Sequence, residues 1–327
     1  MSSPDRLEFI VDAALAAARD PASDSIERAE MLMELAMGLQ QQPKTPDHLR
    51  QAVALYDEAL SVCPASQELL SARIAARKAT ALQAIPDQGT SLLEQARAVL
   101  EDAIPDLARL GGPEELAEAE MNLGLVLQQL AGSGRAPIAD AIAAYQRALR
   151  TFDLVRHPIE FAILQNNLAA AFLAMPATDE RARIREALAV RCFEEGLKVV
   201  NLLDHPSEYA MLQNNLGNAL QYAASSHALE NNLRAMEAYD EALKVRTRET
   251  APLAYANTLA NKANCLRNLP DEALPAGDGD SLQRSRACYE EARAIFVDHG
   301  EFEKARLVAE ALAALEQEVM TELNRTG

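Results

Sequence analysis

Asparagine is the polar residue whose spacing in this sequence is most regular. Four asparagines recur at intervals of 45, 48 and 46 residues, at Asn122, Asn167, Asn215 and Asn261. Others directly precede two of them or follow about one helical turn later: Asn166, Asn214, Asn218 and Asn264. A primary amide donates and accepts hydrogen bonds, so a row of amides can bind the backbone of an extended peptide. The same row could instead bind neighbouring elements of this chain and hold their spacing, and the sequence leaves both interpretations open.

The other residues able to do chemistry form no catalytic or metal-binding pattern. The sequence has no G-x-S-x-G, phosphate loop, H-E-x-x-H or glycine-rich dinucleotide turn. His157 and His205 stand one repeat apart, too far to share an ion. None of the four cysteines forms a C-x-x-C pair, so a reducing compartment is the simplest interpretation. We therefore expect a protein that is not an enzyme and has no metal or cofactor.

The balance of charge limits the partners that this chain can bind. Its 327 residues include 31 lysines and arginines against 49 aspartates and glutamates, a formal net charge of -18. Because the acidic residues are spread along the chain, nucleic acids and anionic membranes are poor partners. A neutral or basic protein segment is compatible with this surface. No apolar run approaches the roughly 20 residues of a membrane span, and the charged N-terminus does not resemble a signal peptide, so we expect a cytoplasmic protein.

Internal repetition is the strongest sequence signal for the fold. The segments 158–168 and 206–216 are near copies, and an alanine near the start of each unit recurs every 43 to 49 residues from Ala29 to Ala305. With aromatics at 4%, no tryptophan and few glycines or prolines, this pattern favours helices packed through small residues. We predict a repeat array over residues 25–300, with units starting near 25, 67, 113, 158, 206 and 252. Capping helices are predicted in residues 1–24 and 301–327.

Each unit contains two helical patterns, which we call helix A and helix B. Helix A mostly opens at a proline, whose missing N–H is no loss in the first helical turn. Helix B carries a large residue followed three positions later by a small one, so that a bulky side chain lies beside a gap on one face. These pairs are Tyr56/Ala59, Leu100/Ala103, Tyr145/Ala148, Phe193/Gly196, Tyr239/Ala242 and Tyr289/Ala292. We expect core packing for them and for the aromatics that open A helices, Phe161, Tyr209, Tyr255 and Phe302.

These motifs resemble the tetratricopeptide repeat family. Its Leu-Gly pair on helix A, with a large apolar residue three positions on, matches Leu123-Gly124…Leu127 and Leu216-Gly217…Leu220. Its alanine–aromatic–alanine pattern on helix B matches Ala235…Tyr239…Ala242. The units exceed the usual 34 residues, which is similar to the longer repeats of kinesin light chain and Pins-like scaffolds.

The resemblance implies an all-α superhelix, a solenoid of about six helix pairs with capping helices, whose A helices line a concave groove. It also implies a scaffold or adaptor that binds an extended segment of a partner protein there. The expected contacts are Asn122, Asn166, Asn167, Asn214, Asn215, Asn218, Asn261 and Asn264, with Tyr222 near the end of an A helix. Two alternatives remain open at this stage, a self-assembling structural module and a sensor of a peptide or small ligand. The partner, the pathway and the oligomeric state are not given by the sequence.

Overall fold

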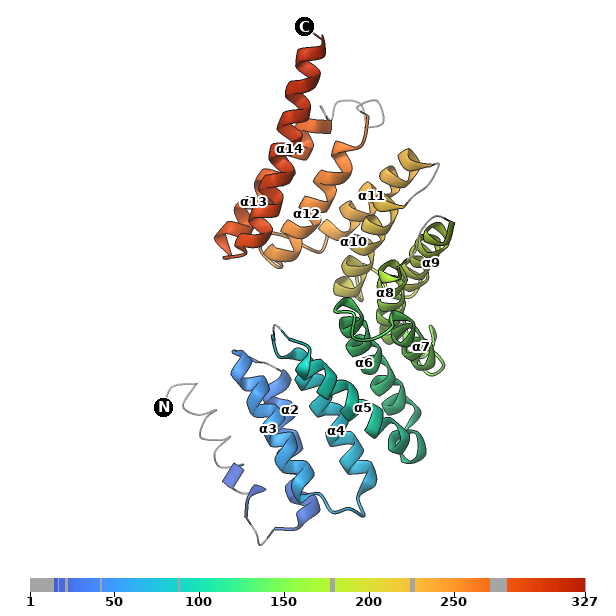
Figure 1. Ribbon diagram of the computed structural model, residues 1–327, viewed down its shortest axis with the longest axis vertical. Helices are drawn as coiled ribbons and strands as arrows, with labels where there is room; N and C mark the ends of the chain where they lie inside the picture. Colours follow the sequence, from blue (N-terminus) through green and yellow to red (C-terminus); the bar gives the residue numbers. More distant parts are fainter. Residues whose placement is uncertain are drawn as a thin grey trace. The chain divides into compact units, whose positions relative to one another are not determined.

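The computed structural model describes residues 15–16, 18–20, 23–41, 43–87, 89–176, 180–223, 227–270 and 281–326. All regular secondary structure in these ranges is helical, which confirms the expected all-α fold (Figure 1). The helices are α2 (Ser25–Gln41), α3 (Pro46–Val62), α4 (Glu68–Ala84), α5 (Ser91–Leu110), α6 (Pro113–Gly132), α7 (Ile138–Ala148), α8 (Pro158–Ala174), α9 (Glu180–Leu197), α10 (Pro206–Tyr222), α11 (Ala228–Leu243), α12 (Pro252–Arg267), α13 (Ser281–Asp298) and α14 (Phe302–Thr326).

Prolines mark the beginning of many of these helices. Pro113, Pro158, Pro206 and Pro252 each occupy the first position of an A helix, where their fixed φ suits the helix and no N–H is needed. His157 and His205 are the N-cap residues before two of these prolines, which agrees with a role in the turn. The local sequence therefore determines where successive A helices begin.

The helices form two compact units, residues 1–153 and residues 154–327. In the first unit the A helices are α2, α4 and α6, each packed against the B helix that follows it. In the second unit the A helices are α8, α10 and α12, the B helices are α9, α11 and α13, and α14 packs on α13. Within each unit, successive A helices also contact one another. The core therefore lies between helices of neighbouring pairs, as expected when no pair can bury its own apolar face.

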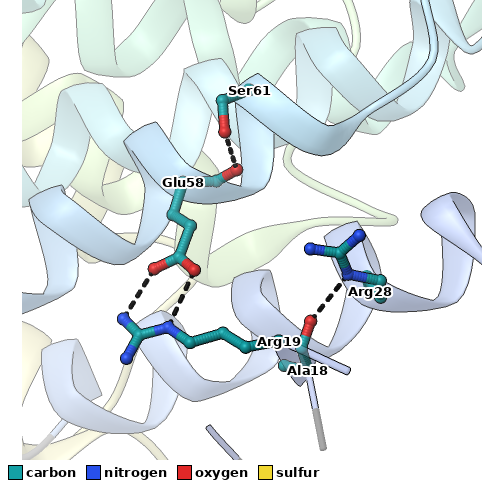
Figure 2. Close-up of polar contacts among 5 residues, drawn as sticks. All are labelled: Ala18, Arg19, Arg28, Glu58 and Ser61. Atoms are coloured by element: carbon teal, nitrogen blue, oxygen red, sulfur yellow. Dashed lines mark hydrogen bonds and ion pairs between the residues drawn. The ribbon is translucent and has the colours of Figure 1, made fainter. Parts of the chain in front are cut away.

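Residues 18–20 are tied to the first helix pair by polar contacts (Figure 2). The Arg19 guanidinium donates to both carboxylate oxygens of Glu58 on α3, at 2.8 and 2.7 Å. This hydrogen bond lowers the pKa of Glu58. From α2, Arg28 Nε donates to the carbonyl oxygen of Ala18 at 2.9 Å, and the Ala18 side chain is fully buried. The N-terminal capping helix expected in residues 1–24 lies mostly outside the described residues.

The large residues of the B helices form the centre of the core, as predicted. Tyr56, Leu100, Tyr145 and Tyr239 have no exposed surface, and Phe193 and Tyr289 are equally buried in practice. The prediction for the aromatics that open A helices holds less well. Phe161, Tyr209 and Tyr255 are only partly buried, and the hydroxyls of the two tyrosines reach carboxylates, Tyr209 to Glu241 at 2.9 Å and Tyr255 to Glu291 at 3.2 Å.

The core prediction for Phe302 is wrong. Its side chain is 69% exposed. Phe302 opens α14, and no described helix packs over α14 in the way that α11 and α13 pack over the A helices α10 and α12. The register that partly buries the equivalent aromatics in earlier units therefore leaves this ring at the surface.

The tyrosines of two B helices approach the paired A helix too closely for any side chain beyond hydrogen. A Cβ placed on Gly217 of α10 would lie 2.6 Å from the Tyr239 ring, and one on Gly124 of α6 would lie 2.4 Å from the Tyr145 ring. Each tyrosine hydroxyl then donates to a glutamine four residues along the same A helix, Tyr145 to Gln128 at 2.8 Å and Tyr239 to Gln221 at 2.9 Å. The packing of the ring fixes the distance between helix A and helix B. The hydrogen bond of the hydroxyl fixes the position of one helix relative to the other along the helix axis.

Replacing Gly217 with alanine should test this close approach. The added methyl group meets the Tyr239 ring, and overpacking of a core costs about 1–3 kcal/mol of unfolding free energy. Gly38→Ala is the matched control, because a Cβ on that helical glycine meets nothing within 4 Å. Alanine at an open helical position should stabilise by roughly 1 kcal/mol. The urea midpoints of the two variants should therefore shift in opposite directions. Shifts of the same sign would contradict the close packing of the Tyr239 ring on Gly217.

Truncating the ring itself should be more damaging. Tyr239→Ala is expected to lower the unfolding free energy by ~3–5 kcal/mol, as for other fully buried aromatics. Because repeat stacks couple mainly through nearest neighbours, the loss should be local and should add an unfolding step. Thermal melting followed by circular dichroism measures this, and a wild-type melting curve would mean that Tyr239 does not support the core.

Candidate functional site

The asparagines of the second unit form a continuous row of hydrogen-bonded amides, which we call the amide row. It consists of Asn166 and Asn167 on α8, Asn214 and Asn215 on α10, and Asn261 on α12. Asn261 Nδ2 donates to Asn214 Oδ1 at 3.3 Å, and Asn214 Nδ2 donates to Asn215 Oδ1 at 3.0 Å. Asn215 Nδ2 then crosses to Asn166 Oδ1 at 2.8 Å, and Asn166 Nδ2 donates to Asn167 Oδ1 at 3.3 Å. The row thus connects three successive A helices through side chains alone.

Burial divides the amide row into an inner and an outer set. Asn166 is 9% exposed and Asn214 is 8% exposed, whereas Asn167, Asn215 and Asn261 are half-buried. A buried amide must find partners because leaving a donor or acceptor unpaired is costly. The inner asparagines find them on the neighbouring helices. At the ends of the row, Asn167 Nδ2 and Asn261 Oδ1 make no hydrogen bond to any residue that the structure describes.

Two residues that the sequence analysis missed extend the row on its α12 side. The hydroxyl of Thr258 lies 3.1 Å from Asn214 Oδ1 and 2.9 Å from the carbonyl oxygen of Ala254, and its single proton can serve one of them at a time. Arg246 Nη1 donates to the same hydroxyl at 3.0 Å. Burial lowers the pKa of Arg246, which forms no ion pair with a described carboxylate.

The sequence does contain a signal that Thr258 has a role other than apolar packing. In the repeat register it stands where α8 and α10 carry the fully buried Leu164 and Leu212. A hydroxyl at a core leucine position is unusual, and it lies one turn before Asn261 on the same helix. Arg246 had no such signal, since it lies in the turn before α12 and reaches the row only in three dimensions.

The remaining predicted contacts of the second unit lie in different surroundings. Asn218 Oδ1 lies 2.8 Å from the Tyr239 hydroxyl and competes with Gln221 for its single proton, so the Asn218 carbonyl faces the buried tyrosine. Tyr222, at the C-terminal end of α10, is 66% exposed. Asn264 Nδ2 of α12 donates to the Tyr222 hydroxyl. Tyr222 and Asn264 therefore form a second polar pair between α10 and α12, which is more exposed than the amide row.

Asn122 belongs to the first unit and has charged rather than amide neighbours. It lines a small hollow between α4 and α6 together with Arg77, Thr80 and Glu118. In the same hollow, Arg73 Nε donates to Glu115 at 2.6 Å. The hydrogen bond from Arg73, followed by that from the Gly112 N–H, lowers the pKa of Glu115. Asn122 itself is half-buried.

Three further properties of the described residues concern metal binding, thiol ionisation and membrane spanning. They contain no group of three or more His, Cys, Asp or Glu side chains placed to hold a metal ion. Burial raises the pKa of the Cys265 thiol to about 12 and that of Cys192 to about 11, so both thiols are protonated near neutral pH. Among the described helices, none is sufficiently long and apolar to cross a bilayer.

The two sets within the amide row should respond differently to truncation. Asn214→Ala removes three hydrogen bonds from a buried position, those to Asn215, Asn261 and Thr258, which should lower the unfolding free energy by about 1–3 kcal/mol. Asn167→Ala removes a single long hydrogen bond within α8, that from Asn166 Nδ2, and leaves the bonds between helices in place, so it should cost less, about 1 kcal/mol. Urea denaturation of both variants measures the difference. Equal losses would mean that the row does not hold the helices at their spacing.

Comparison with known proteins identifies the fold. No protein-family model and no curated protein sequence matches this chain. The crystal structure of BtubC (BKLC) from P. vanneervenii is similar, with a TM-score of 0.52 and 20% identity over 75% of this chain and 92% of that one. A Signal Transduction ATPase with Numerous Domains from Pyrococcus horikoshii, which has a tetratricopeptide repeat sensor, matches with a TM-score of 0.57 and 14% identity, over 88% of this chain and 40% of that one. The chain therefore has a tetratricopeptide-like fold, an all-α solenoid of repeated helix pairs.

Proposed function

We propose that this chain is a scaffold or adaptor without catalytic activity, which binds an extended segment of a partner protein along the A helices of its second unit. The observation that carries the proposal is the amide row. Its outer members are half-exposed, and its two ends offer a donor on Asn167 and an acceptor on Asn261 that no described residue uses. A peptide backbone presents the complementary carbonyl and N–H groups.

The hydrogen bonds within the row favour this role because they hold the amides in place before a partner arrives. A free asparagine on a helix surface samples several rotamers, and ordering such side chains on binding costs about 0.5–1.5 kcal/mol each. In the row, Asn215 and Asn261 are already held by Asn166 and Asn214. Less ordering then remains for the binding step.

The predicted contact residues accordingly divide into two roles. We assign Asn166 and Asn214 to holding the helices because they are buried, and Asn218 because its carbonyl faces the Tyr239 hydroxyl. Asn167, Asn215 and Asn261 would touch the partner, and Tyr222 with Asn264 would extend the contact surface. Asn122 would act similarly in the first unit. The net charge of -18 favours a neutral or basic segment.

Self-assembly is a second candidate function, favoured by one specific observation. Phe302 is 69% exposed and Leu307 is 57% exposed, and both lie on α14. Residues 301–327 would then serve as a contact between copies instead of a cap for the 25–300 array. Light scattering over a range of concentrations distinguishes the two, because a scaffold that acts alone keeps a constant mass.

The binding proposal is tested on a partner recovered by cross-linking and affinity purification from the native organism. Asn167→Ala should weaken partner binding by about 2- to 10-fold, the equivalent of one lost hydrogen bond, with only a small fall in melting temperature from the lost bond to Asn166. Replacing Asn167, Asn215 and Asn261 together should weaken it by about 10- to 1,000-fold, with some loss of stability because the last two also bridge helices.

The matched control is Gln51→Ala, which removes an exposed amide from the B helix α3 and should leave binding unchanged. Isothermal titration calorimetry and thermal melting give the two readouts. Wild-type affinity in the triple variant, at any melting temperature, would exclude the amide row as the recognition surface.

A further inference from the structure

A basic groove lies between two B helices of the second unit. It is lined by Arg183, Val190 and Arg191 of α9, by Arg234 of α11 and by Leu220 near the end of α10. It encloses about 470 Å³, within the range of volumes that hold a few side chains of a ligand. None of the asparagines of the amide row lines it.

The charge around this groove is opposite to that of the chain as a whole. Three arginines and two glutamates, Glu186 and Glu194, line the groove. Glu194 is already paired with Arg234 at 2.6 Å. Arg183 and Arg191 are exposed and form no ion pair with any described residue. Two guanidinium groups are therefore available to a ligand in a protein whose net charge is -18.

Helix stability does not explain the placement of these arginines. Arg181 and Arg183 lie in the first turn of α9, and Arg185 follows directly. The N-terminus of a helix carries a partial positive charge, so cations there are unfavourable and acidic residues are preferred. A ligand that places negative charge beside Arg183, which lines the groove, would relieve this unfavourable charge.

Apolar side chains lie beside the charged ones on the same helix. Ile184 is 62% exposed and Leu188 is 39% exposed, one turn apart on α9. Val190 and Leu220 are part of the groove itself. The surface thus offers guanidinium groups for carboxylates and apolar area for one or two aliphatic or aromatic side chains.

We infer that the α9–α11 groove binds an acidic segment of a partner protein, in which aspartates or glutamates alternate with apolar residues. Arginine suits this role because its planar fork binds a carboxylate through two parallel hydrogen bonds. The site goes beyond the function proposed above, since it lies on B helices and selects the opposite charge. Carboxylates on Arg183 and Arg191 would fix the segment, and its apolar side chains would cover Val190 and Leu220.

The test uses the full chain and a fluorescein-labelled synthetic peptide of interspersed glutamates and leucines, with fluorescence anisotropy as the readout. At about 0.1 M salt the Debye length is about 10 Å, so remote acidic residues of the chain are screened and groove contacts remain. The wild type should bind this peptide, and a peptide with glutamine in place of glutamate should bind at least about tenfold more weakly, or about 1.4 kcal/mol.

Arg183→Glu with Arg191→Glu should weaken binding of the acidic peptide at least about tenfold. The matched control is Arg248→Glu with Arg293→Glu, which changes the net charge equally on exposed arginines of the same unit and should stay within about twofold. Circular dichroism should show both variants folded, because a glutamate in the first turn of α9 suits the helix dipole.

Three results would each overturn the inference. The first is no binding of the acidic peptide by the wild type. The second is an equal loss of binding in the two double variants, which would indicate a general electrostatic effect. The third is equally tight binding of a single-stranded oligonucleotide, which would show an unselective polyanion surface. None of these results bears on the amide row, whose variants leave the α9–α11 groove intact.

Discussion

The contact between a B-helix aromatic ring and a small residue on the paired A helix is the interaction on which the rest of the structure depends. Where the ring is Tyr145 or Tyr239, the A helix has glycine, and any larger residue would force the two helices apart. Where the ring is Phe193, without a hydroxyl, the corresponding positions hold Ala169 and Leu173 in place of glycine and glutamine. The separation within each pair, and hence the spacing of A helices, follows from this packing.

The amide row can exist only when that spacing is correct. Its link between α10 and α8 is one hydrogen bond of 2.8 Å between Asn215 and Asn166, and such bonds weaken rapidly beyond about 3.2 Å. By contrast, the ion pairs that join successive repeats, such as Arg234 with Glu194, are solvent-exposed. Exposed pairs contribute only about 0–1 kcal/mol. Apolar packing therefore sets the spacing of the A helices, and the hydrogen bonds of the amide row form only at that spacing.

The sequence predicted the parts of this structure that depend on periodic side-chain volume. The buried aromatics, the proline-opened helices and the all-α class all follow from patterns that repeat along the chain. Phe302 was misplaced because a repeat pattern shows where a residue lies on its helix but not whether another helix covers it. The bonding among Asn166, Asn214 and Asn261 could not be predicted, since recurrence shows that residues share a face but not which rotamers they adopt. Arg246 and the α9–α11 groove depend on segments that meet only in the folded chain.

The two candidate surfaces of the second unit rely on different physics, and this difference limits how they can be used. The amide row is uncharged and directional, so its contacts depend on the alignment of a backbone and change little with ionic strength. The α9–α11 groove presents two guanidinium groups that form no ion pair with a described carboxylate, and their attraction for carboxylates extends over a Debye length and weakens as salt is added. A segment suited to one surface is therefore poorly suited to the other. An acidic segment is repelled by the overall charge of the chain unless it reaches the arginines of the groove. A neutral or basic segment gains no attraction from these arginines. If both proposals hold, selection by charge between the A-helix and B-helix surfaces would allow one repeat array to distinguish two kinds of protein segment.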